Sequence, residues 1–175
     1  QKVTPQIVDR SMVVSTLIRA LEFCIGGRSC KSYDFGCDLL AWNSIKIEYD
    51  RVTLYSPNCW EWVVSYYGIL KTGAVVNPIN VMLTPSEVEF IANDCGASVV
   101  IASYEKAMSI QNVKERSEVR ELIAFGDEPL PDGMLAFNAV LDAANDNFEV
   151  PDIDPLSLST IGYTSGTTGH PKGAC

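Results

Sequence analysis

The sequence predicts an α/β fold in which a parallel sheet is flanked by helices. Short apolar segments typical of strands alternate with helical patterns in units of about 25 residues. These segments are continuously apolar rather than alternating, as in strands that are covered on both faces. Glycines and helix-capping residues mark the boundaries between units. The length of 175 residues suits one domain or slightly more.

The first predicted elements lie before the regular pattern. Apolar residues at helical spacing and a closing pair of glycines predict an amphipathic helix over residues 8–24. A short helix is expected over residues 34–42. A strand over residues 51–55 begins the regular pattern. We therefore divide the chain into residues 1–50, which hold the N-terminal helix and a segment of weak pattern, and an α/β unit over residues 51–175.

The next unit is a helix over residues 59–72 followed by a strand over residues 74–77. Asn58 and Glu61 have the spacing of a capping box at the helix start. The helix is apolar almost all round, which predicts burial on more than one side. Gly73 closes it.

A second capping box runs from Thr84 to Glu87, with a proline at the first helical position. It opens a helix that is expected to run to about Asp94. A glycine ends this helix, and the apolar residues 97–102 form the next strand.

The remaining elements complete the alternation. We expect a helix over residues 103–117 and a strand over residues 121–125. Two loops rich in Pro, Gly and Asp flank a short helix over residues 134–143. The last strand is expected over residues 158–164.

The charge balance argues against some partners. With 13 basic and 22 acidic side chains, the net charge is −9, so neither nucleic acid nor an anionic membrane surface is an expected partner. After Arg120, nine carboxylates face a single cation, Lys172. No apolar run approaches the ~18 residues that a membrane-spanning segment needs.

The six cysteines bear on metal binding, on disulfides and on the cellular compartment. They lack the short spacing of zinc ligands, and the chain has one histidine. A chain of this size does not need disulfides to compensate for a small core. We expect buried free thiols, no metal site and a cytoplasmic protein.

The last predicted strand runs into residues 163–174, which read YTSGTTGHPKGA. Gly166, Gly169 and Gly173 allow tight turns and close approach of the backbone to a ligand. Consecutive N–H groups in such a turn form a concave anion site. Lys172 adds a positive charge, and four hydroxyls add donors, from Thr164, Ser165, Thr167 and Thr168. Together these groups predict a cradle for a polyphosphate at the carboxyl end of a strand.

Two other phosphate loops do not fit this segment. A Walker A loop needs Gly-Lys-Ser/Thr, whereas Lys172 is preceded by proline and followed by glycine. A dinucleotide loop needs a second glycine where Thr168 stands.

The segment YTSGTTGHPKGA instead resembles the signature loop of the adenylate-forming superfamily, which includes acyl-CoA synthetases, adenylation domains of nonribosomal peptide synthetases and luciferases. The upstream text VTLYSPNCWEWVVSYYGILKTGAVVNPINVMLTPSEVEFIANDCGASVVIAS is similar to the N-terminal region of the same superfamily. The resemblance covers residues 51–175 and is weak over residues 1–50.

The resemblance implies a two-step ligase that uses ATP, Mg²⁺ and coenzyme A. A small-molecule carboxylate would attack the α-phosphate of ATP to form an acyl-adenylate, and a thiol would then displace AMP. Fatty acid metabolism is the expected setting. By motif position, the residues implied to bind the ATP phosphates are Thr164, Ser165, Gly166, Thr167, Thr168, Gly169 and Lys172.

The superfamily's catalytic residues lie downstream of this loop, so the resemblance implies none in this chain. We therefore expect the chain to be the N-terminal part of a longer enzyme, inactive alone and inclined to self-associate. Two alternatives stay open. One is a fragment of an adenylation domain that loads a carrier protein, and the other is a truncated, non-catalytic module that binds a nucleotide or a protein partner.

Overall fold

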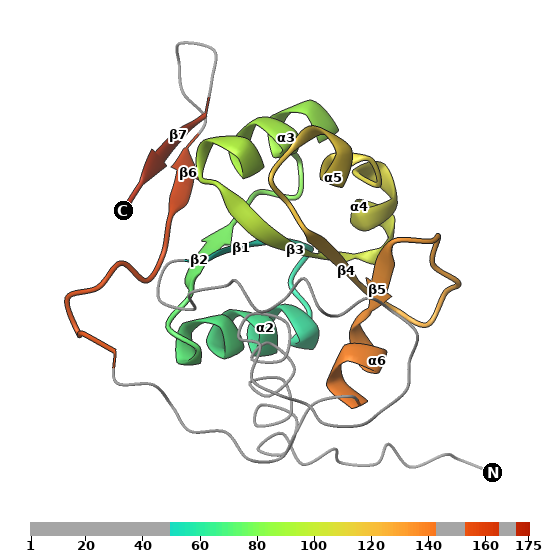
Figure 1. The fold of residues 1–175 in the computed structure, drawn as a ribbon, viewed down its shortest axis with the longest axis horizontal. Helices are drawn as coiled ribbons and strands as arrows, with labels where there is room; N and C mark the ends of the chain where they lie inside the picture. Colours follow the sequence, from blue (N-terminus) through green and yellow to red (C-terminus); the bar gives the residue numbers. More distant parts are fainter. Residues whose placement is uncertain (1–49, 143–152, 165–170) are drawn as a thin grey trace.

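The computed structural model describes residues 50–142, 153–164 and 171–175. They contain a five-stranded sheet in the order β2-β1-β3-β4-β5, in which every neighbouring pair is parallel (Figure 1). The predicted parallel α/β fold is therefore confirmed. The strands are β1 (Arg51–Tyr55), β2 (Val75–Pro78), β3 (Ala97–Ser103), β4 (Glu121–Phe125) and β5 (Met134–Ala136).

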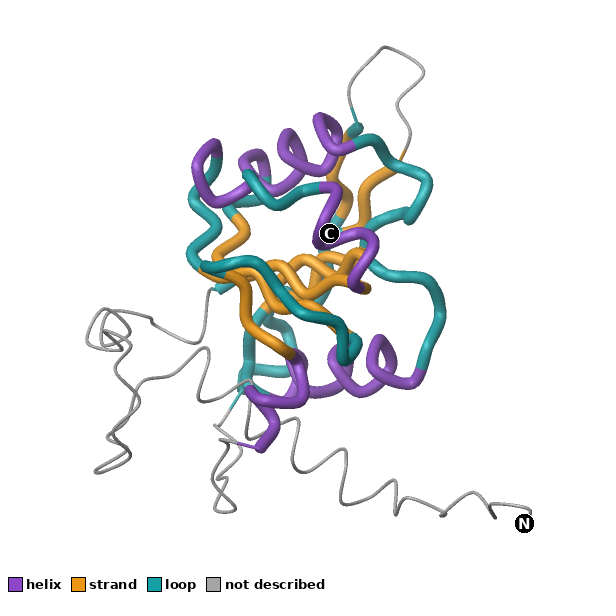
Figure 2. The backbone as a smooth tube through the Cα atoms, turned by 90° about the vertical axis from the view of Figure 1, so that its right-hand side faces the viewer, coloured by secondary structure: helices purple, strands orange, loops and turns teal. Residues whose placement is uncertain are grey.

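Helices cover both faces of this sheet, as Figures 1 and 2 show. One face carries α2 (Trp60–Lys71) and α6 (Phe137–Asp142). The opposite face carries α3 (Pro85–Asp94), α4 (Tyr104–Ser109) and α5 (Val113–Arg116). Cover on both faces explains why the strands are apolar along their whole length.

The strands feed two cores because successive side chains point to opposite faces of the sheet. The α2 core includes Val52, Leu54, Ile101, Ile123 and Phe125, which are packed with side chains from α2 and α6. The α3 core includes Tyr55, Val88, Ile91, Val100 and Leu122.

The two predicted capping boxes have different outcomes. Thr84 and Glu87 form a complete box: the Thr84 side chain accepts from the Glu87 N–H, and the Glu87 side chain accepts from the Thr84 N–H. The box predicted at Asn58 is wrong. Helix α2 begins one residue later, so its N-cap is Cys59, which makes no side-chain capping bond.

Two other predicted helices also differ from the structure. The helix expected over residues 103–117 is broken into α4 and α5, with a turn at Ile110 and Asn112, residues of low helix propensity. The first residues of the helix expected over residues 134–143 form the strand β5 instead. They pair with the open edge of β4, and this pairing overrides local propensity.

Helix α2 is less buried than its composition predicts. Its inner side, including Val64 and Ile69, lies in the α2 core, whereas Trp60 and Tyr67 are 52% and 56% exposed. The expectation of burial on more than one side is therefore wrong for these described residues. The helices predicted over residues 8–24 and 34–42 lie outside the described residues and stay predictions.

Candidate functional site

The chain returns to the sheet beside the edge strand β2. Two backbone hydrogen bonds of 2.9 Å link Val76 to Ser159 and Ile161. They form a parallel bridge between Val76 and Thr160. The strand predicted over residues 158–164 is thus too long, because the described chain joins the parallel sheet there by one bridge.

Beyond the bridge the chain forms an antiparallel hairpin, which the sequence did not predict. Strand β6 (Gly162–Thr164) pairs with β7 (Lys172–Ala174), and the hairpin lies beside one end of α3 (Figure 1). The two ends of the segment YTSGTTGHPKGA therefore lie in two paired antiparallel strands. The segment does not simply follow a single parallel strand, as the sequence predicted.

The hairpin register brings together two of the predicted phosphate-binding residues. Thr164 lies directly opposite Lys172, so their Cβ atoms are about 5 Å apart. Both residues are exposed. The other five predicted residues lie outside the described residues: Ser165, Gly166, Thr167, Thr168 and Gly169.

Lys172 is an exposed, positively charged residue of the hairpin. Ion pairs between described residues include those of Lys114 with Glu121, Arg116 with Glu89 and Arg120 with Asp50. Within the described part of the chain, Lys172 takes part in no ion pair. An exposed ammonium beside a hydroxyl is suited to bind an anionic ligand.

Side chains from two helices attach the hairpin segment to the sheet. The Tyr66 hydroxyl of α2 lies 3.4 Å from the hydroxyl of Thr160. The Tyr163 hydroxyl donates to Oδ2 of Asp94, the last residue of α3, at 2.5 Å. Burial, and then the hydrogen bond to Asp94, raise the pKa of Tyr163. No local pattern marks these contacts in the sequence, because their partners lie 94 and 69 positions apart.

Gly173 has a different role from the one its sequence context predicts. It lies within β7 opposite Tyr163, not in a tight turn. A Cβ atom at Gly173 would lie 3.2 Å from Cζ of Tyr163 and 3.4 Å from its hydroxyl oxygen. The absence of a side chain therefore makes room for the tyrosine ring.

The described cysteines are free thiols, as predicted, but they are less buried than expected. Cys59 and Cys95 are half-buried and Cys175 is exposed. Burial raises the pKa of both Cys59 and Cys95, which keeps these thiols protonated and poorly nucleophilic. The described ranges contain no group of three or more His, Cys, Asp or Glu residues suited to a metal ion. None of the helices described is long and apolar enough to cross a membrane.

Comparison with known proteins gives a consistent result. The family model "AMP-binding enzyme" matches residues 47–175. A long-chain-fatty-acid–CoA ligase of Escherichia coli O6:H1 (strain CFT073) is 29% identical over 150 residues, which cover 71% of this chain and 27% of that protein. The long-chain-fatty-acid–CoA ligase FadD13 of Mycobacterium tuberculosis (strain H37Rv) is 36% identical over 126 residues, which cover 71% of this chain and 24% of that protein.

A solved structure shares the fold described above. The anthranilate CoA ligase AuaEII, in complex with anthranoyl-AMP, matches with a TM-score of 0.74 and 29% identity, over 94% of this chain and 28% of that chain. The chain thus spans about a quarter of the length of the relatives it matches.

Proposed function

Because the chain belongs to the AMP-binding enzyme family, we propose that it is the N-terminal part of an ATP-dependent acid–thiol ligase. The observation that carries the proposal is the β6–β7 hairpin, which places Thr164 opposite Lys172 at the two ends of the signature segment. Residues 51–175 would form the α/β unit that ends in the phosphate loop. The rest of the large domain and a C-terminal domain would belong to the longer protein.

The proposed reaction has two steps. A carboxylate oxygen attacks the α-phosphorus of ATP, the bond to the β-phosphate oxygen breaks, and pyrophosphate leaves. The sulfur of coenzyme A then attacks the acyl carbon, and AMP leaves with the bonding electrons. AMP-forming chemistry of this kind develops charge on the leaving pyrophosphate, so donors placed there in advance lower the barrier.

This chain would supply those donors. The Lys172 ammonium and the Thr164 hydroxyl would meet the β- and γ-phosphates, together with Ser165, Thr167 and Thr168. Gly166 and Gly169 would let backbone N–H groups approach the same oxygens. Mg²⁺ binds few protein ligands and prefers phosphate oxygens, so we propose that the nucleotide holds it.

The names of the relatives support coenzyme A as the acceptor rather than a carrier protein. They support different acids, a long-chain fatty acid and anthranilate, so the proposal is limited to a small-molecule carboxylate. Fatty acid metabolism is the setting that most of these names favour. We place the enzyme in the cytoplasm, where the free thiols of Cys59, Cys95 and Cys175 stay reduced.

The chain alone is proposed to be inactive and to self-associate. Large apolar side chains are exposed on the described surface, and they are the groups that a longer chain or a second copy would cover. They include Trp60, Val63, Tyr67 and Leu156.

The test uses the protein from the complete reading frame and measures carboxylate-dependent ATP–pyrophosphate exchange. Lys172→Ala should lower kcat/KM for ATP, because a charge-assisted hydrogen bond to phosphate is lost. The corresponding rise in activation free energy is about 1–3 kcal/mol. Lys71→Ala is the matched control, since Lys71 is an exposed lysine on α2, on the opposite face of the sheet. Equal kinetics for Lys172→Ala and the wild type would remove Lys172 from the phosphate site.

A further inference from the structure

Tyr163 stands directly before Thr164 and connects the hairpin to α3. Its ring packs against the α3 core, and its hydroxyl donates to the Asp94 carboxylate at 2.5 Å. Hydrogen bonds from a hydroxyl to a carboxylate at this length are among the strong ones in proteins. Every displacement of Tyr163 along β6 would shift Thr164 and its partner Lys172.

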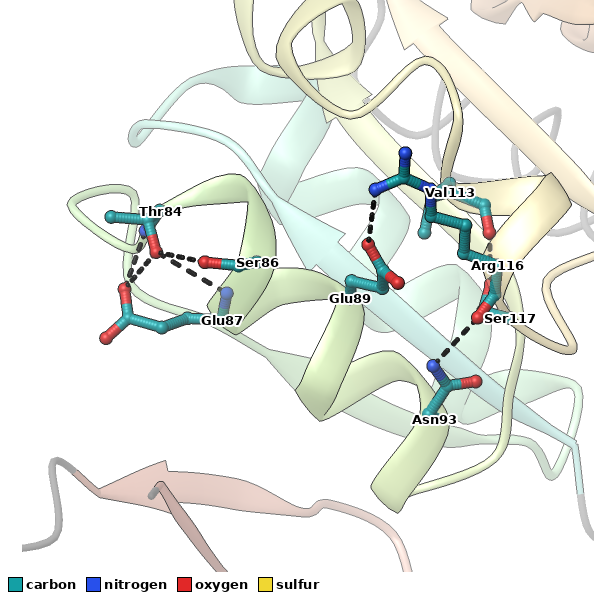
Figure 3. A network of polar contacts seen from close by, with 8 residues as sticks. All are labelled: Thr84, Ser86, Glu87, Glu89, Asn93, Val113, Arg116 and Ser117. Atoms are coloured by element: carbon teal, nitrogen blue, oxygen red, sulfur yellow. Dashed lines mark hydrogen bonds and ion pairs between the residues drawn. The ribbon is translucent and has the colours of Figure 1, made fainter. Parts of the chain in front are cut away.

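Helix α3 supports this bond, because polar contacts attach it near both of its ends and its inner side lies in the α3 core (Figure 3). Its N-terminus is closed by the capping box of Thr84 and Glu87. Farther along, Asn93 donates to the carbonyl of Arg116 at 3.1 Å, and Glu89 pairs with the Arg116 guanidinium at 3.8 Å.

The residue that follows Asp94 is fixed as well. The carbonyl of Cys95 accepts a hydrogen bond of 2.7 Å from Nε of Arg51, at the start of the central strand β1. The backbone at Asp94 is therefore held between the end of α3 and the sheet, and the exposed Asp94 carboxylate accepts from the Tyr163 hydroxyl.

The other side of Tyr163 faces the partner strand. Gly173 lies opposite Tyr163, and a Cβ there would come within 3.2 Å of the ring carbon Cζ. The partly buried ring thus lies between the β7 backbone and the α3 core, with its hydroxyl on Asp94. A tyrosine hydroxyl is protonated at neutral pH, and the raised pKa of Tyr163 extends its role as a donor into the alkaline range.

We propose that Tyr163 and Asp94 form a clamp that positions the hairpin, so that Thr164 and Lys172 meet the β- and γ-phosphates of ATP. This inference rests on the proposed function and deepens it. Tyr163 is a positioning residue here, because its hydroxyl is occupied by Asp94 and acts on the nucleotide through the hairpin. The clamp should therefore matter for a triphosphate or pyrophosphate and not for AMP, which lacks the β- and γ-phosphates.

The test compares Tyr163→Phe with the wild type in the protein from the complete reading frame. ATP affinity and pyrophosphate affinity should weaken about tenfold, the scale of a lost hydrogen bond to a charged group, whereas AMP affinity should stay within about twofold. Hydrogen exchange at residues 162–164 and 172–174 should become faster in the same variant.

Three further variants separate positioning from general destabilisation. Asp94→Ala should reproduce the effect of Tyr163→Phe, and combining both changes should add little, because they remove one interaction. Asp94→Asn keeps an acceptor oxygen and should restore part of the ATP affinity. Tyr55→Phe is the matched control, since it removes a hydroxyl bond of 2.7 Å to the Leu83 carbonyl away from the hairpin.

The outcomes distinguish the clamp from the proposed reaction. Equal weakening of ATP and AMP in Tyr163→Phe, or the same ATP-selective loss in Tyr55→Phe, would overturn the clamp. The clamp would also be overturned if Tyr163→Phe changed neither the hydrogen exchange of the hairpin amides nor the affinity for ATP. If the wild type shows no carboxylate-dependent exchange with pyrophosphate, the proposed reaction fails, and the exchange rates of the hairpin amides still decide whether the clamp exists.

Discussion

The five-stranded sheet and the β6–β7 hairpin are built in contrasting ways. The sheet has helices on both faces, and its central strands β1 and β3 are almost fully buried. In the hairpin, all three residues of β7 are exposed, and the segment before β6 joins the sheet by one parallel bridge. The difference indicates that the sheet supplies the stability, and it agrees with our proposal that the hairpin supplies the ligand contacts.

The largest loss of stability is expected for a change in the core of the sheet. Ile101→Ala removes a fully buried side chain from the α2 core and should lower the free energy of unfolding by about 3–4 kcal/mol. Urea unfolding of the 175-residue chain, followed by tryptophan fluorescence, measures it.

The matched variant on the hairpin side is Ile161→Ala, which makes the same chemical change next to the bridge. Ile161 is only partly buried, so the expected loss is about 1 kcal/mol or less. Equal losses for the two variants would contradict the division between a sheet buried on both faces and a hairpin segment that is only partly buried.

A smaller loss of stability is expected for a change at the N-cap of α3, the helix that supports the hairpin. Thr84→Ala removes the side-chain cap and should lower the free energy of unfolding by about 1 kcal/mol. Asn58→Ala is the control at α2, where the sequence predicted a cap and the structure has none, so its effect should be within a few tenths of a kcal/mol. A larger loss for Asn58→Ala than for Thr84→Ala would contradict the observed caps.

The sequence predicted best where local pattern and tertiary environment agree. The strands over residues 51–55 and 121–125 have the predicted bounds, since short, mostly apolar runs suit a sheet that is covered on both faces. The α3 cap was predicted because its two partners are three residues apart. Strand β5 was missed because its pairing with β4 depends on a distant neighbour.

The candidate site also has features that a local pattern predicts and features that depend on distant residues. Its segment was identified from a run of adjacent glycines, hydroxyls and one lysine, which are all local features. The hairpin register and the bond between Tyr163 and Asp94 join positions that are far apart in the chain, and no local pattern marks them. The motif predicted the chemistry, whereas the structure shows how two of its residues are held.

The most direct test of the central claim is hydrogen exchange of the protein from the complete reading frame, with ATP and with AMP. If the hairpin binds the β- and γ-phosphates, ATP should slow exchange at residues 162–164 and 172–174 more than AMP does, while the strands of the sheet exchange alike with both. Equal protection of the hairpin by ATP and AMP, or none from ATP under conditions where ATP is bound, would contradict the claim.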